Sequence, residues 1–365
     1  MKIKTELLQQ MISKAIKGAS NNNMIPITSL IGIQVKNEQL ILMTTDGSNQ
    51  LRINEKIELD PMYGKADLQE FYTIVNADTF SKLVGKTTKE FIELENKENY
   101  LEVIGNGTYK LELAVNEDGE MVKFPEIKDI QGEELSLNLE ILQEQIRTAK
   151  ASVAKTMEVP CLTGYYISNN TIATDRQMVC FIQNQEMREP LLISSEMAEL
   201  LLLIDGAEIL EIVKKDNELI FYTDKYTIYG KELEGKEMYP VTAIENLVAL
   251  NYKNSVKVKK EEILNVLDRM SLFVTDYDKG GVYLDFTEAG LIIRSQKSNA
   301  EEIIEIQNTL EPDERFNCLV DIEMLKSQIE TVSTDIVEIY YGQEKSIKIV
   351  DGNCSLVISL LEKSN

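Results

Sequence analysis

Two short stretches that follow each other recur in similar form along this sequence, and their pattern indicates the fold. Val159-Pro160-Cys161-Leu162-Thr163-Gly164 is followed by Thr171-Ile172-Ala173-Thr174-Asp175. Earlier in the chain, residues 25–32, which begin with Ile25-Pro26, are followed by Leu40-Ile41-Leu42-Met43-Thr44-Thr45-Asp46. A looser third copy covers residues 281–286 and 290–295. Alternation of polar and apolar residues predicts half-buried antiparallel strands here, within a unit that is repeated along the chain.

Two helices are expected in each copy of this unit. The first is amphipathic, and the second follows a capping residue, at Asn76, at Ser194 or Ser195, and at Asp321. Successive caps lie about 120 residues apart, which is the size of a domain. The apolar faces of the three amphipathic helices contain Leu7, Leu8, Met11, Ile12, Ala15 and Ile16; Leu139, Leu142, Ile146, Ala149 and Val153; and Ile263, Leu264, Leu267, Met270 and Val274.

Each copy closes with two strands around a polar turn, and the first two copies end alike, at Phe124-Pro125 and Tyr239-Pro240. Proline cannot donate to a strand ladder, so both pairs are predicted to mark domain borders. Helices on one face of an antiparallel sheet predict the α+β class. We expect three similar domains, at residues 1–127, 128–246 and 247–365, with linkers over residues 128–134 and 241–247. A dimer of such chains could close a ring of six domains.

The composition narrows the classes of function. The chain has 365 residues, of which 43% are hydrophobic and 27% charged, as in an ordinary globular protein. It has no histidine, which removes the usual general base and the commonest zinc ligand. Its four cysteines, Cys161, Cys180, Cys318 and Cys354, form no CxxC pair and are predicted to be free, buried thiols. We therefore predict no catalytic site, no metal and no cofactor.

Charge and hydropathy bear on the partners. No apolar run approaches the roughly 20 residues that a membrane-spanning helix needs, and the first residues form no apolar signal segment. The sequence therefore predicts a cytoplasmic protein with no membrane partner. The net charge of −23 disfavours a general nucleic-acid binder. It allows a protein that encloses DNA, because net charge does not specify where the cationic residues lie.

In these residues the chain resembles the bacterial sliding clamp, the beta subunit of DNA polymerase III, over essentially its whole length. The resemblance rests on residues 160–164, Ala173-Thr174-Asp175, Thr44-Thr45-Asp46-Gly47 and the two proline-ending borders, in that spacing. It implies the DNA clamp fold, in which two chains meet head to tail around double-stranded DNA. It also implies an accessory subunit without catalysis, with a replicative DNA polymerase and a clamp loader as partners.

The resemblance implies two sets of site residues. A hydrophobic cleft for partner peptides should include Leu162, Thr174, Arg176, Gln177, Val179, Leu247, Leu356, Ile358 and Leu360. Cationic residues of the inner wall should face DNA, namely Lys14, Lys17, Lys82, Lys86, Lys89, Arg147, Lys150, Lys155, Lys259, Lys260, Arg269 and Lys326. Without the resemblance, the aliphatic residues fit ordinary core packing and the cationic ones an ordinary solvated surface.

Several positions depart from the family pattern. The family usually has Gly, His and Arg where this chain has Arg176, Gln177 and Met178, and an Arg where it has Val159. These departures suggest a divergent clamp, for example one encoded by a phage or another mobile element. Two other classes of function stay open. One is a metal-dependent nuclease using Asp46 and Asp175, although their recurrence favours turns at strand ends. The other is a clamp-like scaffold that binds proteins and no longer encircles DNA.

Overall fold

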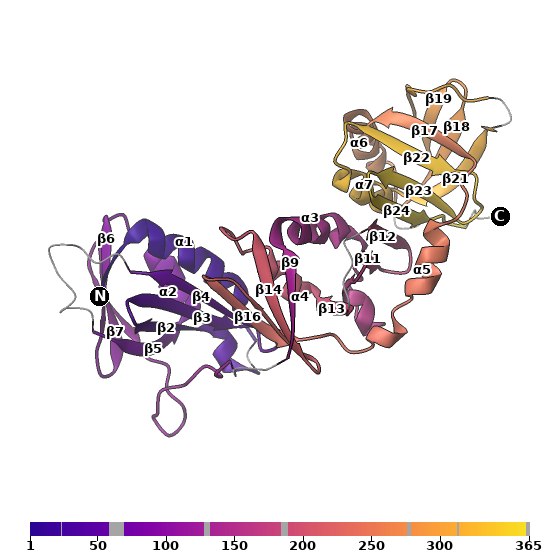
Figure 1. Cartoon of the computed structure of the whole chain (residues 1–365). Coiled ribbons are helices and arrows are strands. Elements are labelled where there is room, and N and C mark those ends of the chain that lie inside the picture. Colours follow the sequence, from indigo (N-terminus) through magenta and orange to yellow (C-terminus); the bar gives the residue numbers. More distant parts are fainter. Residues whose placement is uncertain are drawn as a thin grey trace. The chain divides into compact units, whose positions relative to one another are not determined.

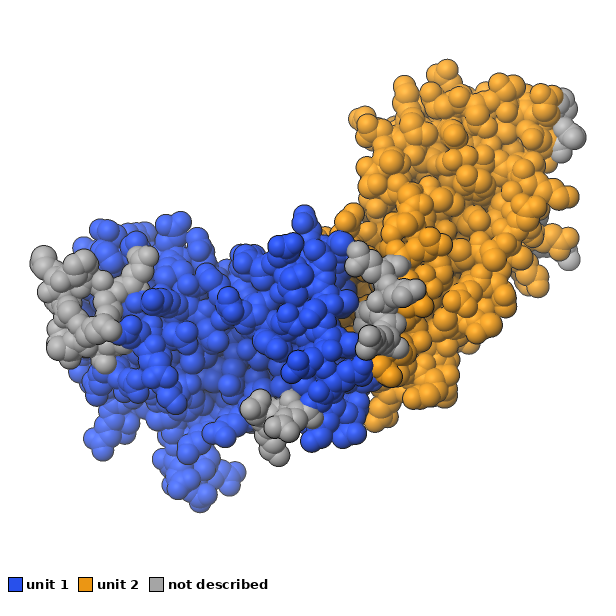
Figure 2. All heavy atoms as spheres, viewed as in Figure 1, with its two compact units in different colours: residues 1–142, 196–232 blue, residues 143–195, 233–365 orange. Residues whose placement is uncertain are grey.

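The computed structural model describes residues 1–22, 24–57, 69–127, 132–183, 189–275, 279–311 and 314–362. These residues form two compact units, residues 1–142 with 196–232 and residues 143–195 with 233–365 (Figure 2). Each unit contains one eight-stranded and one four-stranded sheet (Figure 1). All strand pairs are antiparallel, for example β2 with β3 and β12 with β24, as predicted.

The first unit begins with β1 (Lys2–Lys4), which leads directly into α1 (Thr5–Ala15). Leu8, Met11, Ile12 and Ala15 form the buried face of α1, as the apolar spacing predicts. Helix α1 packs beside α2 (Ala77–Gly85). The four-stranded sheet has the order β1, β6 (Phe91–Asn96), β7 (Tyr100–Ile104), β8 (Thr108–Glu112). The eight-stranded sheet has the order β5 (Phe71–Asn76), β2 (Leu30–Lys36), β3 (Gln39–Thr45), β4 (Gln50–Lys56), β16 (Tyr226–Lys231), β15 (Glu218–Tyr222), β14 (Ile209–Lys215), β9 (Glu133–Asn138).

The second unit repeats this plan. Helices α6 (Lys260–Ser271) and α7 (Ile322–Thr331) pack against each other (Figure 1). The four-stranded sheet has the order β20 (Glu301–Ile304), β19 (Gly290–Ser295), β18 (Gly281–Thr287), β21 (Phe316–Asp321). The eight-stranded sheet has the order β13 (Leu191–Ser194), β10 (Gly164–Ile167), β11 (Asn170–Thr174), β12 (Met178–Gln183), β24 (Cys354–Ser359), β23 (Ser346–Asp351), β22 (Ile336–Tyr341), β17 (Asn254–Lys259).

Three further helices complete the described elements that bear on the site. Helix α3 (Leu139–Ala149) contributes residues to both units, and α4 (Ser195–Leu201) follows β13. Helix α5 (Val241–Val248) occupies the segment predicted to be the second linker, so this segment is helical, and its role as a linker stays a prediction. The segment is ordered because Ile244 is buried in a hydrophobic cluster of the second unit. In the first predicted linker, residues 128–131 lie outside the described residues, and Glu133 and Glu134 already belong to β9.

The sheet orders contain the same four-strand patterns three times. One half of the repeat reads β5-β2-β3-β4, then β13-β10-β11-β12, then β21-β18-β19-β20. The other half reads β1-β6-β7-β8, then β9-β14-β15-β16, then β17-β22-β23-β24. Strand β16 pairs with β4, and β24 pairs with β12, so each eight-stranded sheet joins halves of two successive repeats. For this reason the compact units cut across the predicted middle domain, and the division at residues 128 and 247 stays a prediction.

The predicted caps differ in outcome. Asn76 Oδ1 accepts a hydrogen bond from the backbone N–H of Thr79, and Asp321 Oδ1 accepts from Glu323 and Met324, so both residues cap their helices as predicted. Ser195 is the first residue of α4, and its hydroxyl donates instead to the carbonyl oxygen of Thr163 at 2.7 Å. The four cysteines are free and buried. No helix in the described ranges has the length and apolar character to cross a membrane.

Candidate peptide-binding site and cationic helix residues

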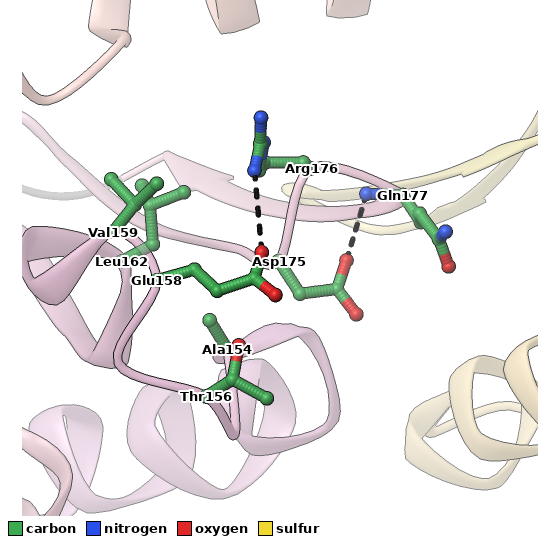
Figure 3. Close-up of a pocket in the computed structure, with 8 residues that line it drawn as sticks. All are labelled: Ala154, Thr156, Glu158, Val159, Leu162, Asp175, Arg176 and Gln177. Carbon is green, nitrogen blue, oxygen red and sulfur yellow. Dashed lines mark hydrogen bonds and ion pairs between the residues drawn. The ribbon is translucent and has the colours of Figure 1, made fainter.

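A pocket of about 200 Å³ lies in the second unit, beside the turn that joins β11 to β12 (Figure 3). The turn supplies Asp175, Arg176 and Gln177 to its lining. The segment between η4 (Lys150–Ser152) and η5 (Pro160–Thr163), together with the first turn of η5, supplies Ala154, Thr156, Glu158, Val159 and Leu162. The pocket therefore combines small and aliphatic side chains with three charged ones.

Hydrogen bonds from two side chains hold the turn. Asp175 Oδ1 accepts from the backbone N–H groups of Gln177 and Met178, at 2.9 and 2.6 Å. Thr174 Oγ1 accepts from the N–H of Arg176 at 3.1 Å and donates to the carbonyl oxygen of Met178 at 2.7 Å. The backbone of Arg176 has a φ of +82°, in the left-handed region that favours glycine.

The first repeat contains the same turn with a glycine in that place. Asp46 Oδ1 accepts from Ser48 and Asn49 at 2.7 and 2.6 Å, and Thr45 Oγ1 accepts from Gly47 at 3.1 Å. Gly47 has a φ of +100°. The recurring Thr-Asp pair therefore shapes a turn in both repeats. The nuclease hypothesis loses its support, because Asp46 and Asp175 are both held by backbone amides. In the described parts of the chain, no three acidic or cysteine side chains gather as a metal site.

The charged side chain of Arg176 extends over the pocket toward Glu158 (Figure 3). The guanidinium Nη1 lies 3.8 Å from Glu158 Oε2, beyond ordinary hydrogen-bond length. Both side chains are largely solvent-exposed, at 65% for Arg176 and 77% for Glu158. An exposed ion pair of this kind contributes little to stability and can exchange for another partner.

Behind the pocket lies a hydrophobic cluster that contains Leu162, Val179 and Val357, with Leu247 of α5 packed against it. Tyr239, of the predicted border Tyr239-Pro240, stacks on Tyr166 with ring centroids 5.2 Å apart. Burial raises the pKa of Tyr239, and its hydroxyl donates to the carbonyl oxygen of Ile172 at 3.2 Å. The border residue therefore anchors the start of α5 to the sheet. In the first unit, Phe124 packs similarly in a cluster with Met43 and Ile74.

The predicted cleft residues divide into groups. Leu162, Arg176 and Gln177 line the pocket. Val179 belongs to the cluster behind it, Leu247 packs half-buried against that cluster, and Thr174 is buried in the turn. Leu360 is half-buried and lines a different groove of about 690 Å³, together with residues such as Phe316 and Lys345. Only some of the predicted residues therefore lie together at the pocket. Glu158 and Ala154 also line it and were not predicted.

Leu356 and Ile358 lie on the opposite face of β24, which corrects the prediction for these two residues. Val357 pairs with Val179 and shares its cluster, whereas Leu356 and Ile358 are fully buried and pair with Cys180 and Met178. The sulfur of Met178 accepts from Gln328 of α7 at 3.3 Å, so this face packs toward α7. Strand alternation was correct in the prediction, but the sequence did not show which face points to the pocket.

Comparisons with known proteins consistently find sliding clamps. The family model described as DNA polymerase III beta subunit, N-terminal domain, matches residues 1–125. The beta sliding clamp of Bacillus subtilis is 23% identical over 332 residues, covering 86% of this chain and 84% of the relative. The beta sliding clamp of Halalkalibacterium halodurans is 24% identical over 284 residues, covering 74% and 73%. Residues 1–125 match this family, and the chain as a whole is similar to beta sliding clamps.

Solved clamps share the fold. A crystal structure of the sliding clamp from Bacillus subtilis has a TM-score of 0.83 at 18% identity and covers 100% of this chain and 99% of that one. A clamp from Pseudomonas aeruginosa, crystallised with griselimycin bound, has a TM-score of 0.84 at 16% identity, with the same coverage. The clamp fold expected from the sequence is therefore confirmed.

The cationic residues that were predicted to face DNA lie on helices or beside them, but several are paired with acids. The ion pairs are Lys14 with Asp205 at 2.5 Å, Lys82 with Asp78 at 2.7 Å, Arg269 with Glu302 at 2.6 Å, and Lys326 with Asp268 at 2.5 Å. Lys260 donates to the carbonyl oxygens of Glu330 and Val332 at the end of α7. Lys17, Lys86, Lys89, Lys155 and Lys259 are exposed. Arg147 donates to Gln143 at 3.4 Å, and Lys150 has a polar or charged partner as well.

Proposed function

We propose that the chain is a DNA sliding clamp: a homodimeric ring that encloses duplex DNA without reading its sequence and holds the replicative DNA polymerase there. The observation that carries this proposal is the threefold repeat of one helix-and-sheet unit, in a chain that matches sliding clamps along its whole length. The protein has no catalysis of its own in this role. Its place of work is the cytoplasm, and a clamp loader opens and closes the ring.

The strand edges support closure by two copies. Within the chain, the last strand of one half-repeat pairs with the last strand of another, as β4 with β16 and β12 with β24. Two strands in equivalent positions, β8 and β20, are sheet edges. Pairing β8 of one copy with β20 of the other would form a junction like those of β4 with β16 and β12 with β24. In a symmetric dimer this junction would form twice, so that all four edges would be paired.

The side chains at these two edges suit such a junction. Tyr109 on β8 is 40% exposed and Ile303 on β20 is 56% exposed. Leu272, which directly follows α6, a helix that packs against β20, is 80% exposed. Lys110 of β8 and Glu301 of β20 offer opposite charges. Exposed apolar side chains at an unpaired strand edge favour aggregation of a monomer, whereas in a dimer they would be buried in the interface.

The ring would hold DNA by enclosure, with weak contacts to phosphate. The predicted DNA-facing residues would supply these contacts, and their pairing with acids reduces the positive charge that they present. A tethered polymerase then stays at high local concentration near the primer end without being held at one position. We assign the pocket lined by Leu162, Val159 and Arg176 as the site that takes the apolar anchor of a partner peptide.

The second candidate is a scaffold of clamp fold that binds proteins but does not encircle DNA, and the acid pairing of Lys14, Lys82, Arg269 and Lys326 favours it. Primer extension separates the two. A polymerase of the same origin, with its loader and ATP, should make much longer products on a primed single-stranded circle when this chain is added. Unchanged product length, with the polymerase still bound to the chain, would leave only the scaffold.

A further inference from the structure

We propose that Arg176 makes the pocket selective for partner peptides that carry a carboxylate beside their apolar anchor. This inference rests on the proposed function, because it takes the pocket to be the peptide site. It concerns the chemical class of the partner segment. The first repeat of this chain has glycine, Gly47, at the matching position of its turn.

The backbone of Arg176 is the first observation. Its φ of +82° is unfavourable for any residue with a Cβ atom, and the matching turn of the first repeat has Gly47 at +100°. The backbone N–H groups donate to the aspartate and threonine side chains in the same way in both turns, so glycine would suit residue 176 equally well. A non-glycine residue in a strained backbone conformation beside a pocket points to a use for its side chain.

The charges around the pocket are the second observation. Arg176 is the only cationic residue among the eight that line it. Of the two acids, Asp175 is occupied by two backbone N–H groups, and Glu158 approaches the guanidinium only to 3.8 Å at an exposed position. A ligand carboxylate could therefore replace Glu158, forming a shorter and partly desolvated pair with the planar guanidinium.

The opposite choice, a ligand with a cationic side chain, fits less well. Such a ligand would be repelled by Arg176, and glycine at this position would serve it better by freeing Glu158. The net charge of −23 also disfavours acidic ligands everywhere except beside a local cation. Arg176 overcomes that repulsion at the pocket. The apolar part of the ligand would contact Ala154, Val159 and Leu162.

Two short peptides, acetylated and amidated, test this proposal. Both contain two leucines, and they differ only in a central glutamate or glutamine. Fluorescence anisotropy would give the dissociation constant of each for the full-length chain. We expect the wild type to bind the glutamate peptide about three- to tenfold more tightly. Arg176→Gln should bring this ratio close to one, and Arg176→Lys should keep part of it. Glu158→Gln should raise the ratio, because the competing carboxylate is gone.

Arg315→Gln is the matched control. Arg315 is also exposed and paired, with Glu288 at 2.6 Å, and it is not among the residues that line the pocket, so it removes the same charge elsewhere. It should leave the ratio unchanged. Equal binding of both peptides by the wild type, or an unchanged ratio in Arg176→Gln, would overturn this inference alone. A third peptide, identical except for a central lysine, would overturn it too if it bound more tightly than the glutamate peptide. If neither leucine peptide binds, the assignment of the pocket as the peptide site fails as well.

Discussion

Removing the carboxylate of Asp205 should weaken the first unit and release a cation on α1. Lys14 Nζ lies 2.5 Å from Asp205 Oδ2 and donates to the hydroxyl of Tyr226 at 2.7 Å. Tyr226 in turn donates to Asp205 Oδ1 at 2.6 Å. The three groups therefore form a closed triangle that links α1 of the first repeat to β16 and to the loop after α4 in the second.

The size of the effect follows from the exposure of these groups. The side chain of Lys14 is 26% exposed and that of Asp205 is 68% exposed, so solvent screens the ion pair and limits it to about 0.5–1 kcal/mol. The hydrogen bond from Tyr226 to a charged acceptor adds about 1 kcal/mol. Asp205→Ala should therefore lower the free energy of unfolding by about 1–2 kcal/mol at pH 7.

The stability difference between wild type and Asp205→Ala should depend on pH, in a direction set by the pKa of Asp205. Hydrogen bonds from Lys14 and Tyr226 hold the pKa of Asp205 below its ordinary value of 3.8. A carboxyl group whose pKa is lowered by folding stabilises the protein above the unfolded pKa, and this contribution disappears as the pH falls through the folded value. The difference between wild type and Asp205→Ala should therefore be full at pH 7 and should shrink below about pH 4.

Urea denaturation followed by circular dichroism, from pH 7 down to pH 3, would measure this difference. Asp118→Asn removes the same charge from an exposed turn and should change little. The freed Lys14 should also steepen the dependence of DNA binding on salt, by about 0.9 in the logarithmic slope for each protomer, if it faces DNA. Equal stability of Asp205→Ala and wild type at pH 7, or a loss of the same size at pH 3, would show that the contacts of Asp205 with Lys14 and Tyr226 do not stabilise the fold.

Three further predictions concern the turn, the edge and the core. Gly47→Ala should destabilise the chain by about 1 kcal/mol, because alanine would have to adopt a positive φ and its Cβ would lie 3.2 Å from Ile25 Cδ1. Arg176→Gly should not destabilise the chain, because glycine adopts a positive φ without strain. Urea denaturation would compare them, and a loss in Arg176→Gly alone would count against the strain. Leu272→Asp, at an 80% exposed position, should leave the fold intact and give a monomer in sedimentation, and a dimer of wild-type affinity would exclude Leu272 from the interface. Leu356→Ala should lower the free energy of unfolding by about 2–4 kcal/mol through a core cavity, without changing the ratio of affinities for the glutamate and glutamine peptides. A changed ratio would return Leu356 to the pocket.

Much of the fold could be predicted because it depends on local patterns that recur. The Thr-Asp turns, the caps at Asn76 and Asp321 and the apolar face of α1 all involve residues close together in the sequence. Because the same pattern occurs three times, a weak strand or helix pattern in one copy could be assigned from its position in the other two. The helix over residues 241–248 was not predicted, because the segment is short and follows a proline, and the helix depends on burial of Ile244 in a cluster formed with distant residues.

The candidate site was harder to predict because its geometry depends on contacts between distant segments. Alternation in β24 gave two possible faces, and only pairing of Val357 with Val179 selects between them. Glu158 faces Arg176 across the pocket, although neither residue belongs to a motif that links the two. Lys14 is likewise neutralised by Asp205, far along the chain. Cationic residues on a helix can be counted in a sequence, but their acidic partners appear only in the fold.

The central claim, that the chain encloses DNA, is tested most directly by its retention on nicked circular duplex during gel filtration, after incubation with a loader and ATP. An enclosing ring should elute with the circle at a salt concentration that abolishes ordinary phosphate binding, and it should be lost once a restriction enzyme linearises the same DNA. Retention that is equal on circular and linear DNA, or absent from both, would contradict it.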